Sequence, residues 1–194
     1  MNRTKRKIFE TSMKLFSEKG YDATSIEEIT AVVGVAKGTL YYQLSSKEEI
    51  FNFLVEEGMK LLKNSIEIKI QKCDTTIDKL KAVSLVQLKA IEKYENMLTI
   101  VVTQSFGNEK RHEFCRQKVI EYIGVIEEII EDGVKKGDII DVDSSILATE
   151  IFSLTCAALI YMKKEKSEKL DKEKIYKEYE KTWFAKLEKN KEGF

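Results

Sequence analysis

Residues 24–43 read TSIEEITAVVGVAKGTLYYQ and contain two short helical patterns separated by Gly34. A capping box can open the first pattern, because Thr24 can accept a hydrogen bond from the Glu27 backbone while the Glu27 carboxylate bonds back to the Thr24 amide. Gly34 stands where a helix commonly ends in a left-handed residue. The spacing therefore predicts a helix-turn-helix. The apolar residues expected to be buried in its first helix are Ile26, Ile29, Val32 and Val33.

The second pattern, at about residues 36–42, is the predicted recognition helix. Val35 and Leu40 are expected to face inward. The other side chains offer hydrogen-bond donors and aromatic surfaces suited to phosphates and base edges. A helical hairpin that only packs on a core would give the same pattern, with solvated lysines and half-buried tyrosines. The residues expected to face outward are Lys37, Gly38, Thr39, Tyr41 and Tyr42.

Two further stretches, each of which overlaps residues 24–43, extend this window in both directions. Residues 34–50 read GVAKGTLYYQLSSKEEI, and residues 15–25 read LFSEKGYDATS. Together with Ile8 they resemble the TetR (tetracycline-repressor) family of bacterial one-component transcriptional regulators, over about residues 3–52. The resemblance is specific because it joins many positions at fixed offsets.

The resemblance implies an all-α fold with two domains. Residues 1–46 would form a three-helix DNA-binding head, and residues 47–194 a larger helical domain for effector binding and dimerisation. The implied protein is a homodimeric repressor that a small hydrophobic effector releases from a pseudo-palindromic operator in double-stranded DNA; activation is the alternative. The residues implied to bind DNA are Arg3, Thr24, Ser25, Ala36, Lys37, Gly38, Thr39, Tyr41, Tyr42, Gln43 and Lys47.

Two positions depart from the family pattern. Ala36 replaces a frequent Ser or Thr, and Gln43 with Leu44 replaces the usual His-Phe. Losing a capping hydroxyl at Ala36 is expected to weaken the start of the recognition helix by about 1 kcal/mol. Gln43 is expected to make different DNA contacts from a histidine.

A connecting helix is predicted to follow the head. Ser45 or Ser46 can cap it together with Glu48 or Glu49. Lys47, in its first turn, lies where the family places a phosphate contact, so movement at the far end of this helix could reach the DNA. Its apolar face is predicted to hold Ile50, Phe51, Leu54, Val55, Leu61 and Leu62.

The charge balance of the chain indicates that DNA binding depends on specific side-chain contacts more than on general electrostatic attraction. The chain has 33 Lys and Arg against 33 Asp and Glu, and residues 1–52 hold eight of the former against seven of the latter. Such a weak surplus predicts modest non-specific affinity for DNA. A basic group at the start, which could also be an incidental solvated terminus, contains Arg3, Lys5, Arg6 and Lys7.

Composition predicts a helical protein of the cytoplasm without a membrane partner. The chain has no proline, and apolar residues recur at three- and four-residue spacing. No wholly apolar stretch is expected to reach bilayer length, and the N-terminal residues lack the apolar core of a signal peptide. Later helices are predicted near 75–93, 95–106, 110–135, 143–163 and 171–189.

No metal or cofactor site is predicted. Cys73, Cys115 and Cys156 are odd in number and far apart, which argues against a disulfide framework and a zinc knuckle. His112 and Cys115 could share a metal, but one pair of ligands is far short of a site. A small hydrophobic effector is the expected ligand.

The helix predicted over residues 146–162 is apolar on nearly every side and must be covered all round. In the family such a helix, with the final one, meets its symmetry mate in a four-helix bundle, which implies a homodimer. The alternative is that these residues are all intramolecular core. The predicted interface residues are Leu147, Ile151, Leu154, Ala158, Tyr161, Tyr179 and Trp183.

Apolar and aromatic residues between the head and these helices are candidates for an effector pocket. Residues of this kind at helical spacing are more often core, so both interpretations are open. The candidates are Met97, Gln104, Phe106, Phe114, Tyr122 and Phe152.

Two other classes of function are weaker: a helical enzyme or carrier that retains the head as a cap, and a scaffold without ligand or DNA. The chain has one histidine and shows no nucleophile elbow, Gly-rich phosphate loop or metal-ligand spacing. Paired carboxylates such as Glu127 and Glu128 are usually solvated on helices. The sequence therefore predicts a regulator and not an enzyme.

Overall fold

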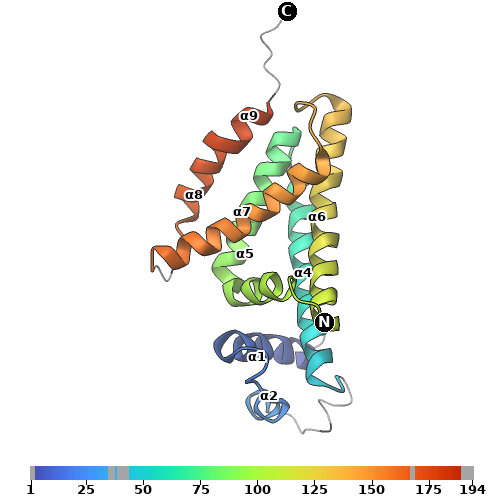
Figure 1. Cartoon of the computed structure of the whole chain (residues 1–194), viewed down its shortest axis with the longest axis vertical. Helices are drawn as coiled ribbons and strands as arrows, with labels where there is room; N and C mark the ends of the chain where they lie inside the picture. The colour runs from blue at the N-terminus through green and yellow to red at the C-terminus, as the bar shows by residue number, and fades with distance from the viewer. Residues whose placement is uncertain (1–2, 35–37, 39–43, 167–168, 189–194) are drawn as a thin grey trace, which may run out of the picture. The chain divides into compact units, whose positions relative to one another are not determined.

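The computed structural model describes residues 3–34, 38, 44–166 and 169–188, and over these ranges it is helical without a β-strand (Figure 1). The all-α prediction is confirmed. The helices are α1 (Arg3–Lys19), α2 (Ile26–Val33), α4 (Lys47–Ile70), α5 (Thr76–Gln104), α6 (Lys110–Lys136), α7 (Ser144–Lys164), α8 (Lys172–Tyr179), the π-helical turn η1 (Glu180–Phe184) and α9 (Ala185–Leu187).

The predicted helices of the larger domain correspond closely to these elements. The break expected between 93 and 95 is a non-helical residue inside α5, Tyr94, with φ −135° and ψ 29°. The final predicted helix, 171–189, is in fact α8, η1 and α9 in succession. A π turn inserts one residue into the helical register, which changes the direction of the side chains that follow it.

The chain forms two compact units that divide the long helices. Unit 1 contains Met1–Lys60 and Asn96–Val119, and unit 2 contains Leu61–Glu95 and Ile120–Phe194. Helices α4, α5 and α6 therefore contribute a segment to each unit. These units describe packing, and the functional boundary after residue 46 stays a prediction.

An aromatic cluster forms the core of unit 1. The ring centroids of Phe16 and Tyr21 lie 5.5 Å apart, and Phe51 lies 5.1 Å from Tyr21 and 6.2 Å from Phe16. The two pairs that involve Phe51 are edge-to-face and the Phe16–Tyr21 pair is tilted, and aromatic pairs at such distances add to the stabilisation from burial. The cluster joins α1, the turn after it and α4. The predicted apolar face of α4 is confirmed at Ile50, Phe51, Leu54 and Val55, whereas Leu61 is 43% exposed.

Unit 2 packs α5, α6 and α7 around a second core. Tyr122, Ile126 and Ile130 of α6 are fully buried, as are Ala148 and Ile151 of α7. The Thr76 hydroxyl donates to the Asp138 carboxylate at 2.9 Å, which joins the start of α5 to the turn after α6.

Helix α7 is not wholly apolar, but by length and composition alone its 21 residues could cross a bilayer. The core helix of a soluble protein meets the same criteria. Eight residues of α7 are buried against the rest of the chain, as expected for a core helix.

Candidate functional site

The turn between α1 and α2 is closed by Thr24, and Ser25 caps α2. The Ser25 hydroxyl accepts a bond from the Glu28 N–H at 3.1 Å, and the Glu28 carboxylate pairs with Lys19. The Thr24 hydroxyl donates to the Gly20 carbonyl at 2.8 Å, and Thr24 is 1% exposed. The predicted capping box at Thr24 was therefore one residue out of register, because the threonine hydroxyl is used inside the turn.

The end of α2 has the predicted geometry. Gly34 has φ +70° and ψ 36°, and its N–H donates to the Thr30 carbonyl at 2.9 Å. Ile29 and Val33 are buried as expected, but Val32 is 59% exposed. Residues 29 and 33 lie one turn apart on the buried face of the helix, whereas residue 32 follows 29 by three positions on the side away from 33 and lies at the exposed edge of that face.

Most of the predicted recognition helix lies outside the described residues. Gly38 is described: it is helical and exposed, and a Cβ built there meets nothing within 4 Å. Arg3, at the first position of α1, is also exposed. The predicted DNA contacts that lie outside the described residues are Ala36, Lys37, Thr39, Tyr41, Tyr42 and Gln43.

Lys47 braces the turn of the head. Its Nζ donates to the carbonyl oxygens of Tyr21 and Asp22, at 3.0 and 3.2 Å, and lies 4.5 Å from the centroid of the Tyr21 ring. The start of α4 is fixed as well, because the Ser46 hydroxyl accepts from the Glu49 N–H at 3.1 Å. The Glu49 carboxylate accepts from the Ser45 N–H, which lowers the pKa of Glu49. Of the capping pairs that the sequence allowed, the structure selects Ser46 and Glu49.

Arg111, which the sequence did not single out, lies against the same tyrosine. Its guanidinium carbon is 4.2 Å from the Tyr21 ring centroid, and its Nε donates to the Gln104 Oε1 at 2.9 Å. Burial raises the pKa of Tyr21, and Arg111 opposes that rise. Tyr21 therefore contacts two cations, one from α4 and one from the start of α6. No local pattern could have shown this contact, since it joins residues far apart in the chain.

Removing the Arg111 guanidinium should destabilise the turn between α1 and α2. We expect Arg111→Met to weaken unit 1 by about 1 kcal/mol, the scale of a partly desolvated cation–π contact. Faster hydrogen exchange of the amides of residues 20–24 would report it. Arg6→Met is the control, because within the described residues Arg6 makes an exposed pair with Glu10, which should contribute little. Equal exchange in the two variants would show that Arg111 does not hold the turn.

The predicted effector residues are divided between the two units. In unit 1, Met97 is buried and Phe106 is 84% exposed, while Gln104 and Phe114 are half-buried. In unit 2, the rings of Tyr122 and Phe152 meet at 6.0 Å between centroids. Their assignment to an effector site stays a prediction. Among the described residues, no group of three or more His, Cys, Asp or Glu side chains could hold a metal ion.

The predicted interface residues of α7 belong largely to the core of the single chain. Leu147, Ile151, Leu154 and Ala158 are each at most 7% exposed. Tyr179 donates to the Leu154 carbonyl at 2.7 Å, and Tyr161 accepts from Lys174 at 2.9 Å, so both tyrosines hold α8 against α7. The exposed apolar residues of α7 are instead Ile146 and Ile160, at 60% and 69%.

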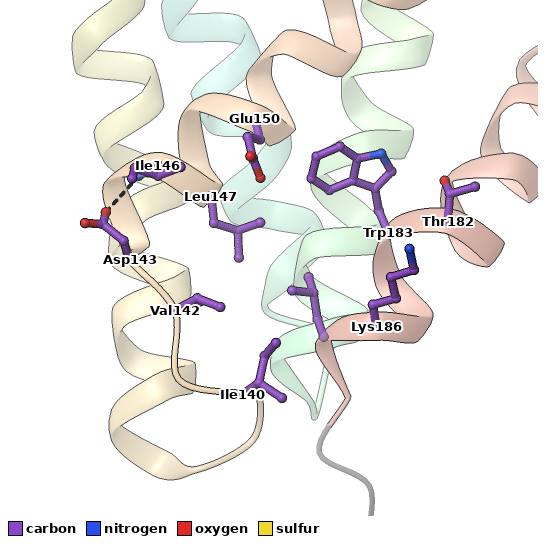
Figure 2. Close-up of a pocket in the computed structure, with 10 residues that line it drawn as sticks. Ile140, Val142, Asp143, Ile146, Leu147, Glu150, Thr182, Trp183 and Lys186 are labelled. Carbon is purple, nitrogen blue, oxygen red and sulfur yellow. Dashed lines mark hydrogen bonds between the residues drawn. The ribbon is translucent and has the colours of Figure 1, made fainter.

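A groove of about 570 Å³ lies between the start of α7 and the η1–α9 segment (Figure 2). Figure 2 shows the Trp183 indole across the groove from Ile146 and Leu147. The Ile140 N–H donates to the Leu187 carbonyl at 3.1 Å, which joins the two sides. The lining is mostly apolar: Ile140, Val142, Ile146, Leu147, Trp183 and Leu187, with Asp143, Glu150, Thr182 and Lys186.

Some known proteins are similar to the N-terminal part of this chain, and others are similar to it over most of its length. Residues 8–54 match the family model described as bacterial regulatory proteins, tetR family. The biofilm operon icaADBC HTH-type negative transcriptional regulator IcaR of Staphylococcus aureus is 38% identical over 76 residues, which is 39% of this chain and 41% of that protein. The chain thus spans about two fifths of the length of this relative.

Many solved structures match this chain, including two that match over most of its length. A Clostridium perfringens putative fatty acid metabolism regulator is 31% identical, with a TM-score of 0.81, over 89% of this chain and 93% of that one. The transcriptional regulator FadR of Bacillus subtilis, solved with stearoyl-CoA, has a TM-score of 0.78 and 20% identity over 89% of this chain and 95% of that one. The latter likeness concerns the fold alone.

Proposed function

The chain belongs to the TetR family of bacterial transcriptional regulators, and from this premise we propose that it is a homodimeric repressor, released from a pseudo-palindromic operator by a small apolar effector. The family is one of regulators and not of enzymes. The observation that carries the proposal is the head itself: Ser25 caps α2, Gly34 ends it in a left-handed conformation, and residues 8–54 match the family. Operator DNA in bacteria is cytoplasmic, and we assign the protein to that compartment.

DNA reading is proposed for the segment after Gly34. Lys37, Thr39, Tyr41, Tyr42 and Gln43 supply the donors and aromatic surfaces that base edges and phosphates require. Gly38 would allow close approach of the backbone, since a Cβ there would meet no described atom within 4 Å. Thr24 and Lys47 are proposed to hold the turn of the head in the free protein, because their polar atoms already bond to backbone carbonyls.

Dimerisation is proposed through the outward stripe of α7. Residues 146, 150, 153, 157 and 160 alternate four- and three-residue steps, which places them along one line of the helix. Ile146 and Ile160 are the exposed apolar ends of this stripe, and Ser153 and Ala157 between them are small. A partner helix could approach closely at the centre and bury both isoleucines. Two-fold symmetry would then match two operator half-sites.

A charge at one end of the stripe should break the dimer. For Ile160→Asp we expect the mass in solution to fall from about twice 22.4 kDa to 22.4 kDa, since an aspartate buried in an apolar interface is costly. Light scattering after gel filtration measures it. Ile68→Asp, at a residue of α4 that is 60% exposed, is the matched control and should stay dimeric. A monomeric wild type would contradict the proposal directly.

The effector is proposed to be an apolar molecule derived from a fatty acid. The 31% identical relative is described as a putative fatty acid metabolism regulator, and the FadR structure holds stearoyl-CoA. Coupling of 1–3 kcal/mol between effector and DNA is typical of allosteric proteins and changes affinity by about 5- to 150-fold. We propose the Arg111–Tyr21 contact as part of the route, because it joins the start of α6 to the turn of the head.

Selection of binding sites from random duplex DNA at near-physiological salt tests the function. We expect an enriched inverted repeat, as a dimer with two recognition helices requires. Adding methyl hexadecanoate or stearoyl-CoA should then weaken binding to the selected site. If the folded protein enriches no sequence, the regulator proposal fails and a carrier or scaffold becomes the better interpretation.

A further inference from the structure

The interior of unit 2 contains polar side-chain atoms that have no hydrogen-bond partner among the described residues. Each of the residues concerned is at most 4% exposed. Buried polar groups in native proteins are nearly always bonded, and each unpaired one costs about 1–3 kcal/mol. Their presence together in one unit therefore calls for an explanation. We name them the polar cluster: Ser84 Oγ, Gln87 Nε2, Tyr122 Oη and Thr155 Oγ1.

Gln87 of α5 and Tyr122 of α6 lie next to each other, and helical spacing places Ser84 and Thr155 on the same sides of α5 and α7 as their neighbours Gln87 and Phe152. Ser84 and Gln87, three residues apart, share a face of α5. The Gln87 amide faces the Tyr122 hydroxyl and opposes the rise that burial causes in the pKa of that hydroxyl, although the two do not reach hydrogen-bond geometry. The Tyr122 ring packs on Phe152 at 6.0 Å, and Thr155 follows Phe152 by one turn on the buried side of α7.

The chemistry of the cluster indicates what it could bind. The Gln87 Nε2 can only donate, and the three hydroxyls can donate or accept, so the cluster is rich in donors. Among the described residues, the buried polar set contains no Lys, Arg or His. A carboxylate would therefore find no buried cation here, and burying an unpaired charge is far more costly than burying a neutral acceptor.

We propose that the polar cluster is the recognition end of an internal ligand site and binds the neutral carbonyl oxygen of an otherwise apolar molecule: a ketone, an ester, a thioester or an amide. The ligand's apolar part lies against core residues such as Val83, Ile126 and Ile151, which are each 0% exposed. Assigning this ligand as the effector rests on the proposed function, but its binding does not require DNA. The unpaired atoms are then a stability cost that the ligand removes.

Thermal unfolding of the full chain without DNA, followed by Trp183 fluorescence, tests the proposal. The probes are methyl hexanoate, methyl decanoate and methyl hexadecanoate, each compared with the alkyl methyl ether of the same length, which lacks the carbonyl. Free fatty acids of the same lengths form the charged arm. We expect at least one ester to raise the unfolding temperature more than its ether and more than its acid.

Variants then show whether the cluster makes that difference. Tyr122→Phe and Gln87→Leu should each weaken ester binding by about tenfold, the value of one hydrogen bond, and leave ether binding unchanged. Ser12→Ala is the matched control: Ser12 Oγ is also buried and unpartnered, but it belongs to unit 1, and its loss should not alter ester binding. Having two variants keeps the test valid if one of them fails to fold.

Three results would overturn the proposal: no stabilisation by any probe, equal effects of ester and ether, or a stronger effect of the acid. If ordered water alone satisfies the cluster, ester and ether will bind equally. Failure of the operator selection is a separate outcome. If the protein binds the ester specifically but selects no DNA, the ligand-site proposal stands and the regulator proposal fails. If it selects DNA but shows no preference for the ester, the regulator proposal stands and the ligand-site proposal fails.

Discussion

Phe51→Ala is expected to lower the free energy of unfolding of unit 1 by about 3–5 kcal/mol and to abolish operator binding. Phe51 is 0% exposed and contacts the rings of both Phe16 and Tyr21. Truncation removes the transfer free energy of the ring and leaves a cavity that its aromatic neighbours cannot fill without moving. Because the cluster joins α1, the turn before α2 and α4, its loss is expected to displace these elements of the head.

Urea unfolding followed by far-ultraviolet circular dichroism measures this loss. Tryptophan fluorescence is not suitable, because Trp183 lies in unit 2 and reports on that unit. Phe106→Ala is the control: the same ring is removed from a residue that is 84% exposed, and the change should be small. If both variants unfold at the same urea concentration as the wild type, the aromatic cluster does not hold the head together.

Local rules predicted most of the helices and little of their contacts. Glycine after an apolar stripe located the end of α2, and Ser-Ser before two glutamates located the start of α4. The register of the α2 cap was missed by one residue, because the Thr24 hydroxyl bonds to the Gly20 and Leu15 carbonyls. That use depends on where α1 ends in space, which propensity and spacing do not contain.

Helix α7 shows a second limit. Its sequence is apolar on nearly every side, so periodicity could not decide which face meets the protomer and which remains for a partner. The structure assigns Leu147, Ile151, Leu154 and Ala158 to the protomer and leaves Ile146 and Ile160 exposed. The dimer surface proposed from the structure is therefore a neighbouring stripe of α7 and not the predicted one.

Long-range polar relations were also beyond the sequence. Arg111 stood in a charged run without any motif, and its contact with Tyr21 comes only from the return of the chain at the start of α6. Gln87 was one polar residue in a helical pattern, and nothing local marks it as 3% exposed beside Tyr122. Such residues become visible only when burial and hydrogen-bond partners are known.

Gly34→Val is expected to cost about 2 kcal/mol and to reduce operator affinity more than tenfold. Gly34 has φ +70°, a conformation that costs a residue with a Cβ about 1–2 kcal/mol and a β-branched one more. The described surroundings are not the obstacle, because among the described residues a Cβ there would meet the Lys7 Nζ alone, at 3.9 Å. The strain is therefore in the backbone, and its relief would change the direction in which the chain leaves α2 toward the recognition helix.

Asparagine separates this backbone effect from the effect of adding any side chain. Gly34→Asn adds a side chain of comparable size, but asparagine tolerates the left-handed conformation, so we expect it to keep most of the operator affinity. Fluorescence anisotropy with the selected operator measures both variants, and urea unfolding shows whether each head remains folded. If valine and asparagine lose affinity equally, the side chain itself obstructs the DNA; if neither loses it, the turn at Gly34 does not set the recognition helix. Only a large loss for valine with a small one for asparagine supports the left-handed turn as the element that aims the head.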